Sequence, residues 1–138
     1  MHDSFNITSP SPDALHIAHF VLAGEIRFGP FYYALSVDDY SFGQRIFGTA
    51  HLWSHSSAFL AVQEWLTIDY SEGPITALVI IDLQLGREAS VARATKGFIV
   101  PETFHGALIT YREKYAAREV VQQFDLDALA SNQWHALA

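Results

Sequence analysis

Cysteine is missing from the sequence, and basic residues are few. Without cysteine the chain can have no disulfide, no thiolate nucleophile and no cysteine-based zinc site. Eight Lys and Arg stand against fifteen Asp and Glu, which gives a net charge of -7. A charge of this sign repels the phosphates of nucleic acids and anionic membranes. The composition therefore argues against nucleic acids and anionic membranes as partners and favours a basic protein.

Long apolar runs and a secretory signal are missing as well. The apolar run ALVII, at residues 77–81, is far shorter than a membrane-spanning helix. The first residues, MHDSFNITSPSPD, lack the basic and apolar regions of a signal peptide. We therefore expect a cytoplasmic protein with one domain over residues 1–138, of which residues 1–13 are flexible.

The acidic residues are concentrated in the first half of the chain. Residues 1–73 carry eight acidic and two basic side chains, whereas residues 74–138 carry seven and six. An acidic binding surface is therefore expected in the first half. Acidity that only keeps the protein soluble is the alternative.

Short runs rich in β-branched and aromatic residues alternate with turn residues along the chain, which is typical of an antiparallel β protein. Residues 14–24 and 116–124 fit either a helix or a strand, and we favour strands in both places. A short C-terminal helix is expected to follow, through Asp127, Leu129 and Trp134. The expected strands cover residues 17–28, 31–39, 45–54, 58–68, 75–85, 87–95, 97–104 and 105–115, with a last strand that ends near 124.

Two of these strands carry further expectations. The run ITALVIID, at residues 75–82, is apolar on both faces and predicts a central strand that is buried on both sides. Pro101 cannot donate a hydrogen bond to a neighbouring strand, so it is compatible only with a sheet edge or a bulge.

Residues 52–88 contain a pattern of the form W-S…L-A-V followed by L…D-L…G. This pattern resembles the propeller-blade repeats of the WD40-like and TolB-like type. The resemblance implies antiparallel, blade-like sheets. A chain of this length cannot close a ring of such blades, so we expect the sheets to pack as a small sandwich. The matching residues are Trp53, Ser54, Leu60, Ala61, Val62, Leu78, Asp82, Leu83 and Gly86.

Candidate chemistry is sparse. On a strand His51 and His55 project from one face, and Glu64 on the next strand could complete a metal site. The carboxylate pairs Asp38–Asp39 and Asp69–Glu72 could serve as acid and base. Solvated turns are the alternative for both pairs, and the sequence contains neither a nucleophile elbow nor a phosphate-binding loop.

Acidic and aromatic residues instead alternate in two predicted loops, where carboxylates could steer a basic partner and aromatic rings could anchor it. We therefore expect a non-catalytic binding protein without a cofactor, such as an acidic inhibitor of the immunity-protein type. A metal-binding protein or enzyme that uses His51 and His55, and a structural homo-oligomer, are the alternatives. The predicted partner-binding residues are Asp38, Asp39, Tyr40, Trp65, Asp69, Tyr70 and Glu72.

Overall fold

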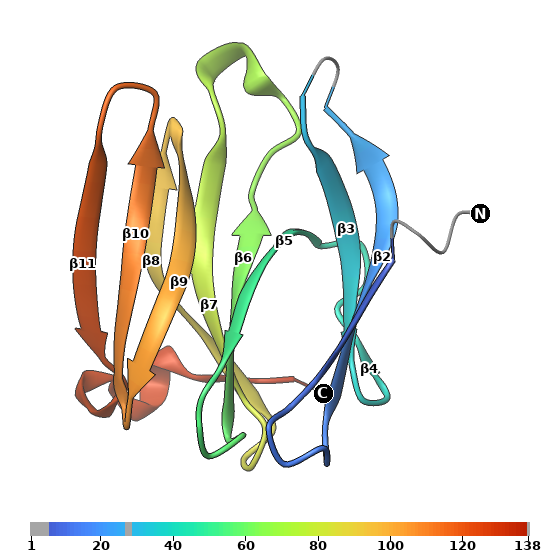
Figure 1. Cartoon of the computed structure of the whole chain (residues 1–138), viewed down its shortest axis with the longest axis vertical. Coiled ribbons are helices and arrows are strands. Elements are labelled where there is room, and N and C mark those ends of the chain that lie inside the picture. The colour runs from blue at the N-terminus through green and yellow to red at the C-terminus, as the bar shows by residue number, and fades with distance from the viewer. Residues whose placement is uncertain (1–5, 27–28, 138) are drawn as a thin grey trace.

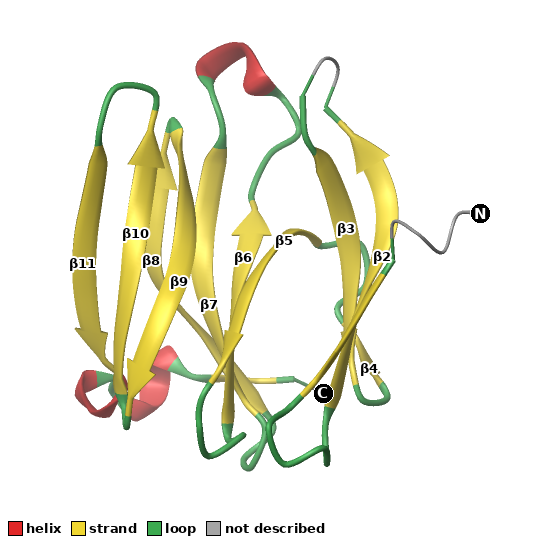
Figure 2. Cartoon of the chain, viewed as in Figure 1, coloured by secondary structure: helices red, strands yellow, loops and turns green. Residues whose placement is uncertain are grey.

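The computed structural model describes residues 6–26 and 29–137, which form two antiparallel sheets (Figures 1 and 2). The larger sheet has the order β1-β2-β3-β5-β6-β7-β8-β12, with β4 paired to β3, and the smaller one has the order β11-β10-β9. The strands of the larger sheet are β1 (Ile7–Pro10), β2 (Ile17–Glu25), β3 (Phe31–Val37), β4 (Tyr40–Ser41), β5 (Ile46–Trp53), β6 (Phe59–Trp65), β7 (Ile75–Asp82), β8 (Arg87–Thr95) and β12 (His135–Ala136). Those of the smaller sheet are β9 (Gly97–His105), β10 (Leu108–Tyr115) and β11 (Glu119–Asp125).

Strands β6 and β7 separate two hydrophobic cores. Side chains of a strand alternate between its faces, so Val79 and Ile81 of β7 enter one core while Leu78 and Ile80 enter the other. Figure 1 shows β2 and β3 on one side of β5–β7, and β9–β11 on the opposite side. The first core contains Phe20, Leu35, Phe47, Leu60 and Val62, and the second contains Ala61, Ala94, Ile99, Phe104 and Ile109.

The mainly antiparallel β prediction is confirmed, as is the burial of residues 75–82 on both faces, because every residue of β7 after Ile75 is buried. Pro101 lies where the register between β9 and β10 shifts, as its missing N–H requires. Strands formed at both ambiguous segments, although Phe28, the predicted end of the first, lies outside the described residues.

Several strands end earlier than predicted, and three short strands were not foreseen. The strand predicted over 58–68 ends at Trp65, because the N–H of Leu66 makes the last bond to β7, to the carbonyl of Ile75 at 2.9 Å, and the chain then turns into the 3-10 turn over Tyr70–Glu72. The strands β1, β4 and β12 have only two to four residues each, which is too short for a recognisable alternation of polar and apolar side chains.

The predicted C-terminal helix is wrong. In its place two 3-10 turns form, η3 (Leu126–Ala128) and η4 (Ser131–Gln133). The N–H of Leu126 donates to the carbonyl of Ala107 at 2.9 Å, and the guanidinium of Arg87 lies 4.3 Å from the centre of the Trp134 ring. These contacts hold the tail against β8 and the β9–β10 turn. The tail therefore follows its tertiary contacts and does not form the i to i−4 hydrogen bonds of an α-helix.

Candidate functional site

The predicted partner-binding residues lie at two opposite ends of the molecule. The loop 66–74, which joins β6 to β7, contains Asp69, Tyr70 and Glu72 and carries the helical turn η2 (Tyr70–Glu72). Asp38 and Asp39 form the turn between β3 and β4, at the other end of β3 (Figure 1). The structure therefore does not bring the two acidic loops together, and each must be considered as a separate surface.

Trp65 forms the base of loop 66–74 and is only 4% exposed. Its indole Nε1 donates to Gln63 Oε1 at 2.7 Å, and the amide of Gln63 donates to the carbonyl of Ile99 at 2.8 Å. Gly48 leaves room for this chain of hydrogen bonds, because a Cβ there would lie 2.0 Å from Gln63 Oε1. Trp65 is therefore a support for the loop and is not available as a surface contact.

Four aromatic rings meet at the base of the loop. The ring of Trp65 lies 5.9 Å from Tyr32, 6.1 Å from Tyr70 and 5.9 Å from Phe98, measured between ring centres. These separations and tilted orientations are favourable for aromatic pairs. The loop is thus fixed to both sheets, since Tyr32 comes from β3 and Phe98 from β9.

Hydrogen bonds within the loop stabilise its conformation further. The carboxylate of Asp69 accepts the N–H of Ser71 at 3.0 Å, and the N–H of Asp69 donates to the hydroxyl of Thr67 at 2.9 Å. The bond from the Ser71 N–H, followed by the bond from its side chain, lowers the pKa of Asp69. Asp69 therefore keeps its negative charge down to lower pH than an ordinary aspartate.

The outer surface of the loop combines aliphatic and acidic side chains. Leu66 is 42% exposed and Ile68 is 57% exposed, and both Asp69 and Glu72 are exposed. Large aliphatic side chains at this exposure on a fixed loop lose little additional conformational freedom when they bind a partner. Neither Leu66 nor Ile68 was predicted from the sequence, because an aliphatic residue next to a strand ordinarily belongs to the core.

The residues of the metal alternative are engaged in other contacts. His51 places Nε2 at 2.8 Å from Ser9 Oγ and Nδ1 at 2.7 Å from the carbonyl of Thr49. His55 lies exposed in the turn between β5 and β6. Over residues 6–26 and 29–137, no group of three or more His, Asp or Glu is arranged to hold a metal ion.

Glu64, the third ligand in that alternative, belongs to an ion-pair network. Arg45 donates from Nε and Nη2 to the two oxygens of Glu64, at 2.9 Å each, and its Nη1 donates to Glu88 at 2.9 Å. Burial opposes the charged form of Arg45, but the hydrogen bonds to Glu64 and Glu88 outweigh it and raise the pKa of Arg45. This network links Arg45, the residue before β5, to β6 and β8.

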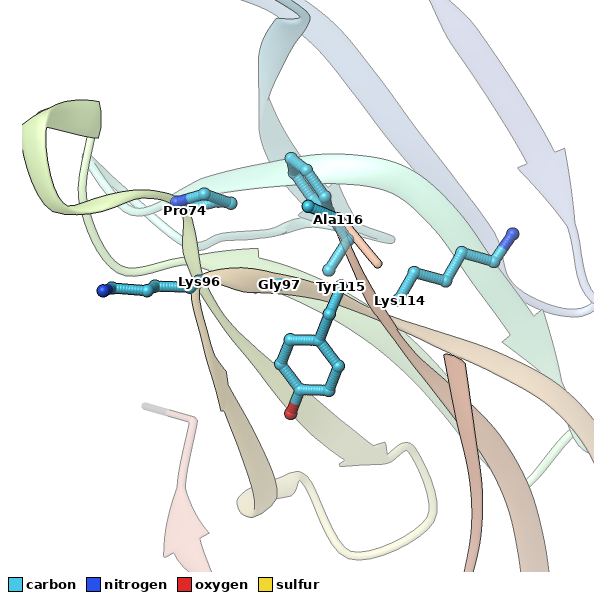
Figure 3. A pocket seen from close by; sticks show the side chains of 7 residues that line it. Pro74, Lys96, Gly97, Lys114, Tyr115 and Ala116 are labelled. Carbon is cyan, nitrogen blue, oxygen red and sulfur yellow. The ribbon is translucent and has the colours of Figure 1, made fainter. Parts of the chain in front are cut away.

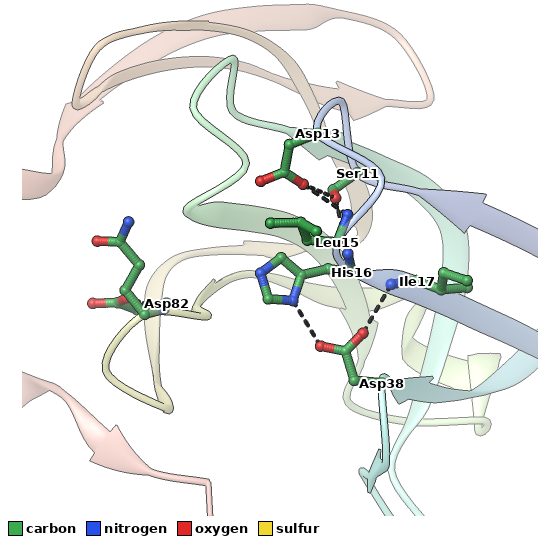
Figure 4. Close-up of polar contacts among 8 residues, drawn as sticks. Ser11, Asp13, Leu15, His16, Ile17, Asp38 and Asp82 are labelled. Atoms are coloured by element: carbon green, nitrogen blue, oxygen red, sulfur yellow. Dashed lines mark hydrogen bonds and ion pairs between the residues drawn. The ribbon is translucent and has the colours of Figure 1, made fainter.

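A pairing of His16 with Asp38 was missed by the sequence reasoning. His16 Nδ1 lies 2.7 Å from Asp38 Oδ2, and the N–H of Ile17 donates to Asp38 Oδ1 at 2.9 Å (Figure 4). The nearby Ser11 hydroxyl donates to Asp13 Oδ1 at 2.6 Å. Asp38 therefore fixes the end of the loop between β1 and β2, and the bond between Ser11 and Asp13 stabilises the same loop from within. No spacing in the sequence indicates the pairing, since its members are far apart along the chain.

A hollow in the surface adjoins loop 66–74 on the side of β9 and β10 (Figure 3). Its volume is about 330 Å³. A second hollow of about 360 Å³, which shares Pro74, Lys96 and Ala116 with the first, borders Glu72 and Gly73. No sequence pattern indicates the first hollow, because its lining combines three segments that are distant along the chain. The first hollow is lined by Pro74, Lys96, Gly97, Phe98, Lys114, Tyr115 and Ala116.

Comparison of the chain with protein-family models, with curated proteins and with solved structures found no match. Within the described residues, no helix has both the length and the apolar character needed to cross a membrane.

Proposed function

We propose that the protein acts by binding a basic protein partner through loop 66–74, as an inhibitor or immunity-type protein, and performs no catalysis. The observation that carries this proposal is the exposure of Leu66 and Ile68 beside Asp69 and Glu72 on a loop whose base is fixed. Aliphatic anchors supply buried apolar area in an interface, and the acidic neighbours attract a cationic partner and orient its approach.

The rigid base of the loop supports the same proposal. A flexible loop would lose conformational entropy on binding, which weakens the complex. Here the ring cluster of Tyr32, Trp65, Tyr70 and Phe98 has already restricted the loop in the free protein. Most of this entropy loss therefore occurs during folding.

Two broader features belong to the proposal. We class the packing of the two sheets as a small sandwich of blade-like sheets, which is supported by the second core between β5–β8 and β9–β11. We also place the protein in the cytoplasm, in keeping with its lack of cysteine.

The proposal is tested with the double variant Asp69→Lys, Glu72→Lys. A tagged chain is first used to isolate partners from an extract of its own cells, and the association rate of the purified partner is then measured on a sensor surface. We expect the double variant to associate about tenfold more slowly or worse, and added salt to slow the unmodified protein by screening.

The matched control is the double variant Asp39→Lys, Asp127→Lys, which makes the same change in charge at the other end of the molecule. All four substituted residues are exposed, so both double variants should fold. Asp69→Asn, which can still accept the N–H of Ser71 but carries no charge, separates the effect of charge from the loss of that hydrogen bond. Equal slowing in the two double variants would mean that net charge alone acts, and selective slowing in the control would assign the interface to the end of the molecule that carries Asp39 and Asp127. Either result would exclude loop 66–74 as the binding site.

A further inference from the structure

The hollow beside loop 66–74 has an apolar wall that depends on close backbone approaches. The ring of Tyr115 lies against Gly97, where a Cβ would be 2.6 Å from Tyr115 Cδ1. The N–H of Gly97 donates to the carbonyl of Pro74 at 3.2 Å, which ties the β8–β9 corner to loop 66–74. Pro74, Phe98, Tyr115 and Ala116 give the hollow a lining with little polar surface. Phe98 and Tyr115 enter this lining from opposite faces of the β9–β10 pair, because Phe98 pairs with Lys114 and Gly97 with Tyr115.

Lys96 is held at the rim of the hollow in an unusual backbone conformation. Its φ of 63° is in the left-handed region, which is uncommon for a residue with a side chain. Gly73 allows the lysine to pack against the loop, because a Cβ there would lie 3.1 Å from Lys96 Cγ. This conformation lets the chain turn sharply between β8 and β9, and it fixes the place where the lysine side chain leaves the backbone.

The charge of the rim is opposite to that of the molecule as a whole. In the described part of the chain Lys96 and Lys114 take part in no ion pair, whereas Arg45, Arg87 and Arg112 are each paired with carboxylates. Figure 3 shows the side chains of Lys96 and Lys114 extending outward from the rim in opposite directions. Two unpaired ammonium groups thus flank an apolar recess.

We propose that this hollow binds a small organic anion with a compact apolar body, such as an aromatic monocarboxylate. The hollow, at about 330 Å³, is at the lower end of the size range of small-molecule sites. The apolar wall would cover the body of the ligand, and a lysine at the rim would bind its carboxylate. This inference goes beyond the proposed function, since it concerns a small-molecule site and not the outer surface of loop 66–74.

The surroundings favour one negative charge over several. Glu72 borders the adjoining hollow, and Glu113 accepts the hydroxyl of Tyr115 at 2.8 Å. These carboxylates would repel a ligand with several charges, such as a nucleotide. A ligand with one carboxylate can place it near either lysine without approaching both acids.

The test uses phenylacetate as the probe and amide shifts in ¹⁵N NMR spectra of the full chain as the readout. We expect saturable shifts centred on Gly97, Phe98, Tyr115 and Ala116, with a dissociation constant in the millimolar range that suits so small a ligand. Phenylacetamide, which lacks the charge, and acetate, which lacks the ring, should both bind more weakly.

Variants connect the binding to the rim. Lys96→Gln and Lys114→Gln should each weaken phenylacetate binding by about two- to fivefold, the usual size of an exposed charge contact. Arg93→Gln removes an exposed cation on β8 outside the lining and should leave binding unchanged. Ala116→Phe places a ring in the hollow and should abolish the shifts without altering the fold.

Four results would overturn the inference. They are shifts that do not saturate, equal binding of phenylacetamide, shifts centred away from the β8–β9 corner, and unchanged affinity in both lysine variants. Because Asp69 and Glu72 are unaltered in these experiments, their failure would leave the binding of a protein partner by loop 66–74 as a separate question.

Discussion

At the scale of single residues, Tyr70 carries a conflict between packing and hydrogen bonding. Its ring joins the cluster at the base of loop 66–74, while its hydroxyl is buried and has no hydrogen-bond partner among the described residues. Burial raises the pKa of this hydroxyl. A polar group buried without a partner destabilises the folded protein.

We therefore expect Tyr70→Phe to keep or increase the free energy of unfolding, with a gain of up to about 1 kcal/mol. Urea denaturation measures the change. Tyr115→Phe is the control, because that hydroxyl donates to Glu113 at 2.8 Å and its loss should cost about 0.5–1 kcal/mol. A marked loss of stability in Tyr70→Phe would show that its hydroxyl has a partner, such as a buried water.

Asp13 is a second residue whose contribution can be measured, through the dependence of stability on pH. Its carboxylate accepts the hydroxyl of Ser11 and the N–H of Leu15, and these bonds lower its pKa below the usual value. The unfolded chain therefore binds a proton at this site at higher pH than the folded protein does. By linkage, the stability supplied by the ionised carboxylate is present above about pH 4 and is lost as the pH falls through the folded pKa.

We expect Asp13→Asn to lower the Tm at pH 7 and to make no difference once the pH has fallen below the lowered pKa of Asp13 in the folded protein. Thermal unfolding followed across this range checks the prediction. The control is Asp39→Asn, at an exposed aspartate in the β3–β4 turn, where the two Tm curves should differ less. A difference between the wild type and Asp13→Asn that is the same at every pH would show that the carboxylate contributes only by its shape.

At the scale of elements, β7 is the strand with the most extensive burial. Val79 is 1% exposed and faces the core beneath β2 and β3, whereas its pairing neighbour on β8, Ser90, is exposed. Strands β2 and β3 therefore cover this face of the sheet at β7 but leave it exposed to solvent at Ser90 of β8.

This boundary predicts opposite outcomes for the same substitution on paired residues. Val79→Asp places an unpaired charge in the core, at a cost of several kcal/mol, and should prevent soluble folding. Ser90→Asp should change the free energy of unfolding by less than about 0.5 kcal/mol, as is usual for exposed positions. Soluble yield and circular dichroism measure both, and a cooperatively folded Val79→Asp variant would show that the first core is open to water.

The type of each long strand could be predicted from the sequence, but its end often could not. Leu66 and Ile68 have the composition of a strand, yet they lie beyond the point where β6 pairs with β7. Likewise the C-terminal residues fit a helix locally, but contacts with Ala107 and with Arg87 determine their conformation. Strand ends and tails depend on partners that local preference does not identify.

At the scale of the whole molecule, the sequence did not predict that the two acidic loops lie at opposite ends of the protein. Composition identified Asp38, Asp39, Asp69 and Glu72 as charged turn residues, and all four are exposed. Their separation follows from β3, which extends from the ring of Tyr32 near loop 66–74 to the β3–β4 turn at the opposite end. Which loops share an end depends on the order and direction of strands in the sheet.

Because strands β6 and β7 contribute side chains to both cores, the order in which the strands leave the ribosome matters. A nascent chain that has emerged only as far as Thr95 holds all the strands that pack in the first core, but it lacks β9–β11, which cover Ala61, Leu78, Ile80 and Ala94 on the opposite face. During that interval the sheet presents an apolar surface to its surroundings. The last third of the chain thus covers this surface. A messenger truncated before β9 would yield a product prone to aggregation.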